Sequence, residues 1–210
     1  MTTVLPEADG IGASAPSSVE RIRDAALKSF ATYGTSATSL RTVAAAAGVS
    51  LGLVQHHFAT KAGLIKAVDD HVLAVVTATM SQPIPRPPAD SLTAMSNRVT
   101  SIMVEHPDVL DYLGRALIEG SPLGTEVFDF LVDTGIDRWK KRAEHGQARP
   151  DIDLEWAVLN ALVLPLGTLI LRSHVERHLL EPLTTPTQLD RWQDAVNMLL
   201  REGLFRPSDR

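Results

Sequence analysis

The segment Ser39–Leu64, SLRTVAAAAGVSLGLVQHHFATKAGL, determines the fold that we expect for this chain. Its first residue is a serine, which suits a helix N-cap, and Gly48 suits the end of the short helix that follows. Ser50 can cap a second helix, on which Val54 and Phe58 stand four residues apart and can face the first. Two short helices joined by a tight turn predict a helix-turn-helix.

Helical periodicity continues through the rest of the chain. Its 210 residues, 44% of them hydrophobic, suffice for one large or two small domains. Apolar residues recur at helical spacing and no alternating run predicts a strand, so we expect an all-α protein. The sequence has no cysteine. That excludes a disulfide framework and thiol-ligated zinc, and it fits the reducing cytoplasm in which we expect the protein to reside.

Charge is distributed unevenly along the chain. Six basic and two acidic residues lie between residues 17 and 66, a net charge of +4 that leaves −9 for the remainder of a chain whose total is −5. A basic end on an acidic body would orient the protein toward a polyanion and keep its other surfaces away. The overall acidity argues against a protein that coats nucleic acid over its whole surface.

Two domains are expected after an N-terminal tail. Residues 1–16 lack the basic and apolar segments of a secretory signal, and we expect them to be disordered. A helix from Ser17 or Ser18 to Gly34 would brace the helix-turn-helix and complete a three-helix domain over residues 17–63. Residues 61–80 should form a helix that connects this unit rigidly to a second domain, residues 64–210, and the four prolines of residues 81–90 predict a loop.

Proline and glycine divide the remaining residues into further helices, expected at 90–105, 107–120, 121–145, 154–180 and 185–201. The segment Trp156–Leu171 is nearly all apolar, but its 16 residues are fewer than the ~20 that cross a bilayer, so we expect no membrane partner. A helix that is apolar all round is buried on every side, which suggests core on one face and a partner subunit on the other. With the last helix it predicts a homodimeric four-helix bundle through about residues 154–200.

The motif resembles that of the TetR family of bacterial transcription regulators over about residues 17–70. The shared pattern is an AGVS turn, an apolar pair, a His-Phe pair, then Lys and Leu, here Ala47-Gly48-Val49-Ser50, Leu53-Val54, His57-Phe58, Lys61 and Leu64. The resemblance implies an all-α homodimer with an N-terminal DNA-binding domain and a C-terminal ligand-binding and dimerisation domain. We therefore expect a sequence-specific repressor of transcription that binds a near-palindromic double-stranded DNA operator and is released by a small ligand; the C-terminal domains of the family vary widely, so the resemblance does not give the ligand.

The resemblance assigns DNA contacts to Ser39, Arg41, Ser50, Leu51, Gly52, Leu53, Gln55, His56 and Lys61. Arg41 falls at the family's base-reaching arginine, whose paired donors suit the O6 and N7 atoms of a guanine. Leu51 and Leu53 offer only apolar contact, for instance to a thymine methyl group. The Ser39 hydroxyl can bind a phosphate, and Lys61 falls at the family's phosphate-contacting lysine.

The polar residues of the second motif helix raise further alternatives. Gln55 stands where many family members have a tyrosine that reaches the DNA backbone, and His56 beside it should be exposed. His57 falls on the apolar side, and we expect a packed histidine there rather than a switch. Adjacent helical residues diverge by about 100°, which disfavours a metal site at the His56-His57 pair. His174 and His178 could grip a metal, but their charged neighbours suggest a wet helix end, so we expect no metal or other cofactor.

The effector is expected to be apolar, because the second domain contains many aliphatic residues and few charges in a buried pattern. Its cavity is predicted to be lined by Met95, Met103, Leu117, Phe128 and Trp139. Each of these residues also suits an ordinary core position, which is the commoner role for such a side chain.

Two other classes of function remain as alternatives. A helical protein–protein adaptor could use the helix-turn-helix purely for packing, but it would not need the exposed basic residues around the motif. An enzyme would need a nucleophile with its base, a phosphate-binding loop or paired carboxylates on one apolar helix face. The sequence contains no such pattern, so we expect the protein not to be an enzyme.

Overall fold

The computed structural model describes residues 16–83 and 91–204, and these consist of helices and connecting turns with no β-strand. The all-α fold that the periodicity predicts is confirmed. The tail predicted for residues 1–16 lies outside the described residues except for Pro16, as do residues 84–90 of the proline-rich loop.

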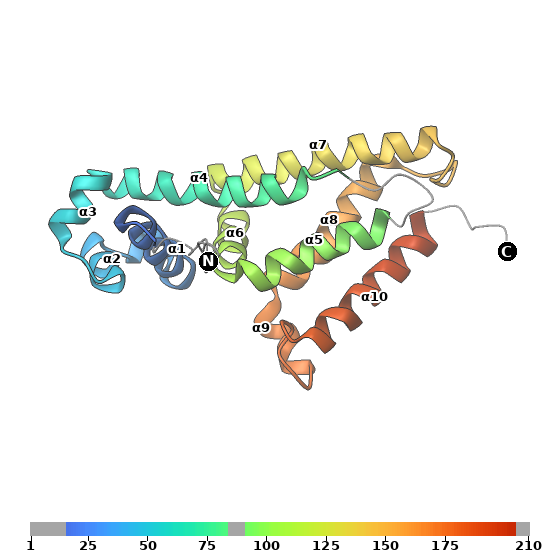
Figure 1. Ribbon diagram of the computed structural model, residues 1–210. Helices are drawn as coiled ribbons and strands as arrows, with labels where there is room; N and C mark the ends of the chain where they lie inside the picture. Colours follow the sequence, from blue (N-terminus) through green and yellow to red (C-terminus); the bar gives the residue numbers. More distant parts are fainter. Residues whose placement is uncertain (1–15, 84–90, 205–210) are drawn as a thin grey trace, which may run out of the picture.

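In chain order, the helices are α1 (Ser18–Ala37), α2 (Leu40–Ala47), α3 (Leu51–Phe58), α4 (Lys61–Met80), α5 (Ser91–Glu105), α6 (Pro107–Glu119), α7 (Pro122–Glu144), α8 (Leu154–Ile170), α9 (Arg172–Val175), the 3-10 helix η1 (Glu176–His178) and α10 (Pro186–Leu204). Figure 1 shows α1, α2 and α3 gathered at one end of the molecule and α5, α8 and α10 toward the other, with α4 running from the first group to the second.

Local signals define both ends of α1. Ser17 and Glu20 form a capping box, in which each side chain accepts a hydrogen bond from the other residue's amide. The Ser17 backbone N–H also lowers the pKa of Glu20. Gly34, at φ +83°, breaks the regular helix where its end is predicted, but the chain resumes helical geometry as far as Ala37. The helix is therefore longer than predicted and is kinked at Gly34.

The turn between α2 and α3 has the geometry that the sequence predicts. Gly48 adopts the left-handed conformation, with φ +65° and ψ 38°, which lets the chain reverse without a Cβ clash. Val43 on α2 and Val54 on α3 are fully buried, and Val49 in the turn packs against them as part of the same core. The predicted helix-turn-helix is present, and Val54 is the one buried residue of α3.

One hydrophobic core extends from the helix-turn-helix into the body of the protein. It joins Ile22 and Phe30 of α1 to Leu64 and Val72 of α4 and to Val127 of α7. The division expected between residues 63 and 64 falls inside α4, which continues through it without a break. The helix-turn-helix is therefore packed against the body rather than tethered to it.

The helix that contains the apolar segment is shorter than predicted. The helix expected over residues 154–180 ends at Ile170, and the chain turns by 70° into α9 and η1. Arg172, just after the bend, pairs with Asp111 of α6 at 2.9 Å. Among the described helices, none is by itself long and apolar enough to cross a membrane; α8 together with the bent segment after it meets only the length and composition criteria.

Candidate nucleic-acid interface

The helix α3 presents one face to solvent at the end of the molecule (Figure 1). Its predicted contact residues divide into the exposed Gly52, Gln55 and His56 and the half-buried Leu51 and Leu53. Leu53 packs against the main core, so less of it is open to a partner than the sequence pattern suggests. The freely exposed surface of α3 is polar and has little side-chain bulk at Gly52.

Serines cap the helices on both sides of the turn. Ser39 Oγ accepts a hydrogen bond from the Thr42 amide at 3.1 Å, and Ser50 Oγ accepts one from the Leu53 amide at 3.2 Å. Both serines are exposed. The remaining first-turn N–H groups of α2 and α3 can therefore meet a phosphate oxygen, to which a helix N-terminus is electrostatically suited.

Arg41 stands in the first turn of α2, and its side chain is exposed. Within residues 16–83 and 91–204 its guanidinium has no hydrogen-bond or ion-pair partner. Five N–H donors in a planar fork are thus available to an acceptor outside the chain.

Lys61 begins α4, and its Nζ donates to the Ser36 carbonyl at 3.2 Å. A tight turn brings it there: Ala59 has φ +53° and ψ −53°, and the Thr60 amide donates to the Phe58 carbonyl at 2.5 Å, which together form a γ-turn. The ammonium of Lys61 is therefore held beside the end of α1 and has two donors left for a phosphate.

The histidine predicted to be packed is exposed. Its ring is hydrogen-bonded to the hydroxyl of Ser18, with His57 Nε2 3.0 Å from Ser18 Oγ, and its centroid lies 5.3 Å from that of His56. The prediction of a buried His57 is wrong, because only Val54 on this helix is enclosed and a residue three positions later points past the edge of the core.

The basic residues around the motif differ in how far they are neutralised. Arg23 pairs with Asp24 and Lys66 with Asp70, both at 2.7 Å. By contrast, the side chains of Arg21, Lys28 and Arg41 are all exposed, and none of these three has an acidic partner among the described residues. The positive charge open to a polyanion therefore comes mainly from these three residues and from Lys61.

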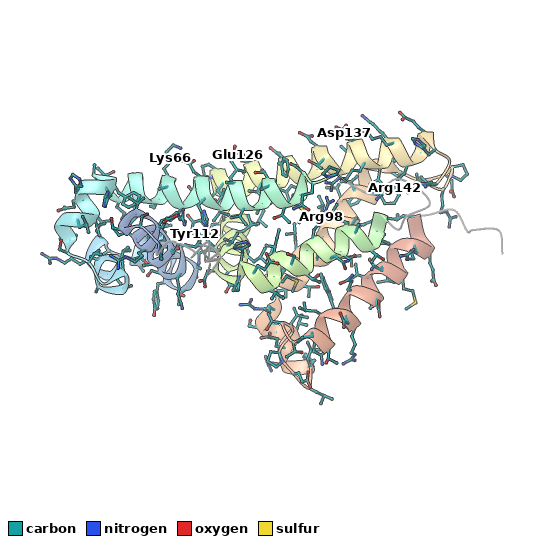
Figure 2. All side chains as sticks on the ribbon, viewed as in Figure 1. Lys66, Arg98, Tyr112, Glu126, Asp137 and Arg142 are labelled. Carbon is teal, nitrogen blue, oxygen red and sulfur yellow. The ribbon has the colours of Figure 1, made fainter. Side chains whose placement is uncertain are left out.

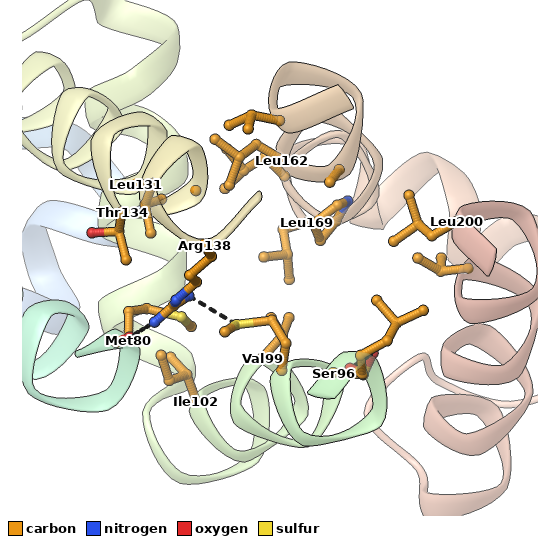
Figure 3. A pocket seen from close by; sticks show the side chains of 18 of the residues that line it. Met80, Ser96, Val99, Ile102, Leu131, Thr134, Arg138, Leu162, Leu169 and Leu200 are labelled. Carbon is orange, nitrogen blue, oxygen red and sulfur yellow. Dashed lines mark hydrogen bonds between the residues drawn. The ribbon is translucent and has the colours of Figure 1, made fainter. Parts of the chain in front are cut away.

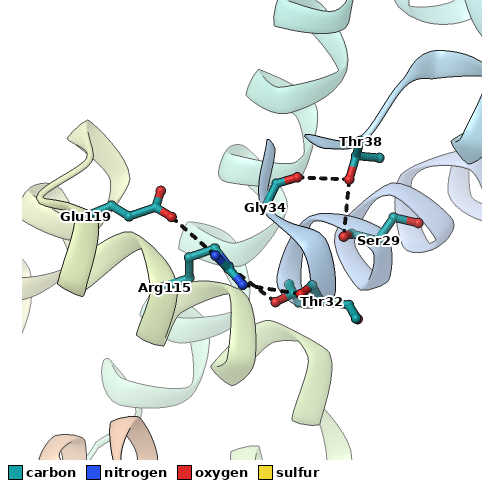
Figure 4. Close-up of polar contacts among 7 residues, drawn as sticks. Ser29, Thr32, Gly34, Thr38, Arg115 and Glu119 are labelled. Carbon is teal, nitrogen blue, oxygen red and sulfur yellow. Dashed lines mark hydrogen bonds and ion pairs between the residues drawn. The ribbon is translucent and has the colours of Figure 1, made fainter. Parts of the chain in front are cut away.

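Arg115 of α6 connects this unit to the body (Figure 4). Its guanidinium donates to the carbonyls of Ala31 and Thr32, at 3.4 and 3.3 Å, and pairs with Glu119 on its own helix at 3.4 Å. Those carbonyls precede the kink in α1, where helical partners are missing. Arg115 thus binds the end of α1 to α6.

A second polar link joins α4 to α6. The Tyr112 hydroxyl donates to an Asp69 carboxylate oxygen at 2.7 Å (Figure 2 marks Tyr112 beneath α4). Burial raises the pKa of Asp69, and burial together with this hydrogen bond raises the pKa of Tyr112. The ring of Tyr112 also lies 6.3 Å from that of Phe30 in α1. Movement of α6 would consequently reach both α1 and α4.

The body contains an apolar cavity of about 170 Å³ between α4, α5, α6, α7, α8 and α10 (Figure 3). Its wall is aliphatic and aromatic except for a few polar side chains, of which Arg138 points into the space. The sequence-based prediction does not include Arg138. Its helical spacing from Leu131 and Gly135, which line the same cavity, is the signal that could have identified it.

The predicted ligand residues are not gathered at one place. Met95 and Trp139 line this cavity, whereas Leu117 and Phe128 line a separate, more open hollow beside α8. Met103 lines neither and is buried against Leu183 and Leu189.

Comparison with known sequences identifies relatives of this chain. Residues 22–68 match the family described as "Bacterial regulatory proteins, tetR family". The chain is 38% identical over 148 residues, 70% of its own length and 69% of the relative's, to the HTH-type transcriptional repressor Rv3405c of Mycobacterium tuberculosis. It is 29% identical over 133 residues to the HTH-type transcriptional regulatory protein RaaS of the same organism, and it covers 60% of that protein's length.

Solved structures share the fold along nearly the whole chain. The ketosteroid transcriptional regulator KstR2 of Mycobacterium tuberculosis superposes with a TM-score of 0.68 at 18% identity, over 92% of this chain and 98% of that one. SmeT, the repressor of a multidrug efflux pump of Stenotrophomonas maltophilia, does so with a TM-score of 0.65 at 19% identity, over 93% of each chain. At these identities the likeness concerns the fold alone.

Proposed function

The chain belongs to the TetR family of bacterial regulatory proteins, and from this premise we propose that it regulates transcription by binding double-stranded DNA. The observation that supports this most strongly is the exposed guanidinium of Arg41 in the first turn of α2, which has no partner among the described residues. Arg41 would read a guanine through two parallel hydrogen bonds, and Gln55 and His56 would meet base edges or backbone. Ser39, Ser50, the two helix N-termini and Lys61 would hold phosphates, while Leu51, Gly52 and Leu53 would allow close apolar approach.

The proposal includes a homodimer formed through residues 154–200. Its support is the apolar surface of α8 and α10, where Trp156, Val163, Met198 and Leu199 are between 56% and 62% exposed. Single exposed apolar residues are ordinary, but four on two neighbouring helices suit an interface. Two copies would place two α3 helices on the half-sites of a near-palindrome. Sedimentation at micromolar concentration should give a dimer that Leu199→Asp dissociates; a monomeric wild-type protein would exclude this arrangement.

We further propose that residues 17–63 act as the DNA-binding domain and residues 64–210 as the ligand-binding and dimerisation domain. A ligand in the cavity would displace α4, α6 or both, and the contacts of Arg115 and Tyr112 would carry that displacement to α1 and α3. The two α3 helices would then no longer match the half-site spacing, and a repressor would leave its operator. The name of the Rv3405c relative, a transcriptional repressor, favours this direction of control.

The test is a titration of a fluorescent DNA fragment from upstream of the protein's own gene, against a scrambled fragment of equal length. Binding should weaken steeply with added salt, because phosphate contacts release counterions. Arg41→Ala should lower the preference for the specific fragment by about 1–3 kcal/mol. Arg177→Ala is the matched control, since Arg177 is exposed and lies outside the helix-turn-helix. Absence of binding at low salt would reject the function, and an unchanged preference in Arg41→Ala would remove Arg41 from base reading.

A further inference from the structure

The wall of the cavity combines a large apolar surface with a cationic group. Aliphatic residues from α4, α5, α8 and α10 face the same space as Arg138 (Figure 3). Arg142, also in the wall, has its guanidinium carbon 5.0 Å from the centre of the Trp139 ring. None of the described residues that line the cavity is an aspartate or glutamate. The cavity therefore has positive charge and no anion from its own described wall.

The contacts of Arg138 leave its charge without a full counter-charge. One Nη donates to the carbonyl of Met80 and the other to the thioether of Met95, at 3.6 Å. A carbonyl is neutral and a thioether is a weak acceptor. Burial, with repulsion from Arg98 and Arg142, lowers the pKa of Arg138 to about 10. At neutral pH the side chain is still cationic, and an anion would stabilise it.

We propose that the cavity binds an amphiphile with one carboxylate, whose apolar chain lies among the aliphatic wall residues while its carboxylate pairs with Arg138. The claim that this amphiphile is the effector rests on the proposed function. The claim that the cavity binds it does not. A carboxylate matches the planar fork of a guanidinium with two parallel hydrogen bonds. A cationic amphiphile would be repelled, and an alcohol would supply no charge.

A single negative charge fits better than a doubly charged head group. The neighbouring Arg98 does not line the cavity, and its guanidinium donates to the carbonyls of Gln82 and Pro83 at 2.7 and 2.6 Å. Of the two arginines in the wall, Arg142 lies against the Trp139 ring, so Arg138 is the guanidinium that we assign to the ligand, and it balances one carboxylate.

The position of Arg138 also connects the ligand to the DNA-binding end. Met80 is the last residue of α4, and its carbonyl is one of those that a helix leaves without an internal partner. A carboxylate that takes the donors of Arg138 competes with this carbonyl and loosens the end of α4. Because α4 starts directly after the γ-turn that ends α3, the change is transmitted along one continuous helix.

Direct binding of three probes to the full-length protein tests the proposal by calorimetry. The probes are decanoate below its micelle concentration, 1-decanol and decyltrimethylammonium. Decanoate should bind about tenfold or more tightly than decanol, as expected for a charge-assisted pair, and the cation should bind most weakly. Arg138→Met should abolish the preference for decanoate over decanol, Arg138→Lys should retain part of it, and the exposed control Arg177→Met should leave it unchanged.

Each variant is judged by the ratio of its affinities for decanoate and decanol, so a change that weakens the binding of both probes equally does not affect the result. Circular dichroism verifies that each variant is folded. Equal binding of decanoate and decanol by the wild-type protein would overturn the proposal, as would an undiminished preference in Arg138→Met. Decanoate should also lower the affinity of the wild-type protein for its upstream DNA and not that of Arg138→Met. If the protein binds no DNA, the proposed function fails, while the calorimetric preference still decides the chemistry of the cavity.

Discussion

Replacing Val54 with alanine should weaken DNA binding although Val54 is placed to touch no DNA. It is fully buried, and it is the only buried residue of an eight-residue helix. So short a helix is not stable by itself and depends on packing. Removing two methyl groups costs about 1.6 kcal/mol at ~0.8 kcal/mol each, and the cavity left behind raises the loss to about 2–3 kcal/mol. For a chain of 210 residues this lowers the unfolding midpoint by roughly 4–12 °C.

Thermal unfolding followed by circular dichroism, at one fixed protein concentration, measures the first effect, and the DNA titration measures the second. Val104→Ala is the matched control, because Val104 is 58% exposed and should change neither quantity measurably. The reasoning would be refuted by a Val54→Ala protein that unfolds at the wild-type temperature, or by one that is destabilised as calculated yet binds DNA with undiminished affinity.

Three further substitutions test other parts of the structure. Gly135→Ala places a Cβ 2.6 Å from a methyl carbon of Val158, where α7 and α8 approach closely. This overpacking should lower the free energy of unfolding by about 1–3 kcal/mol, as measured by denaturant titration, and an unchanged denaturant midpoint would contradict that contact. Ser50→Ala removes the cap of α3 and should cost about 1 kcal/mol in the same assay, whereas no loss would mean that the cap is dispensable. The pKa of Asp69 is raised in the folded state, so folding favours its protonated form, and its contribution to stability is complete below pH 3.8 and is lost as the pH rises through the folded pKa. The unfolding midpoint of the wild type, measured relative to that of Asp69→Asn, should therefore fall over this pH range. A difference between the two midpoints that does not depend on pH would show that the pKa of Asp69 is not perturbed.

The helix-turn-helix could be predicted because its determinants are close together in the sequence. The serine caps, the left-handed Gly48 and the pairing of Val43 with Val54 all act within a few residues of one another. The prediction for His57 is wrong because the residue that binds its ring is distant in the sequence. Its partner, Ser18, is 39 residues away, and helical periodicity gives no information on where α1 begins relative to α3.

The second half of the chain was predicted less well, because contacts distant in sequence determine it. The apolar run after residue 154 gives no reason to end a helix at Ile170, but Arg172 pairs with Asp111 of α6, and Glu176 accepts a hydrogen bond from the Leu183 amide at 3.0 Å. The cavity, too, is formed by residues that are distant in the sequence. Six helices form its wall, so composition could predict apolar residues but not which of them would face the space.

On α3 the exposed residues and the buried residue that holds the helix in place are different positions, and this has a consequence for how such a protein diversifies after gene duplication. Gly52, Gln55 and His56 are exposed, so substitutions there should change stability by no more than roughly 0.5 kcal/mol. Under the proposed function, selection could therefore alter the DNA sequence that a copy prefers one residue at a time, with each intermediate still folded. The buried positions Val43 and Val54 have no such freedom. Under the proposed function, a duplicated gene could thus acquire new target sequences through substitutions that leave the protein folded.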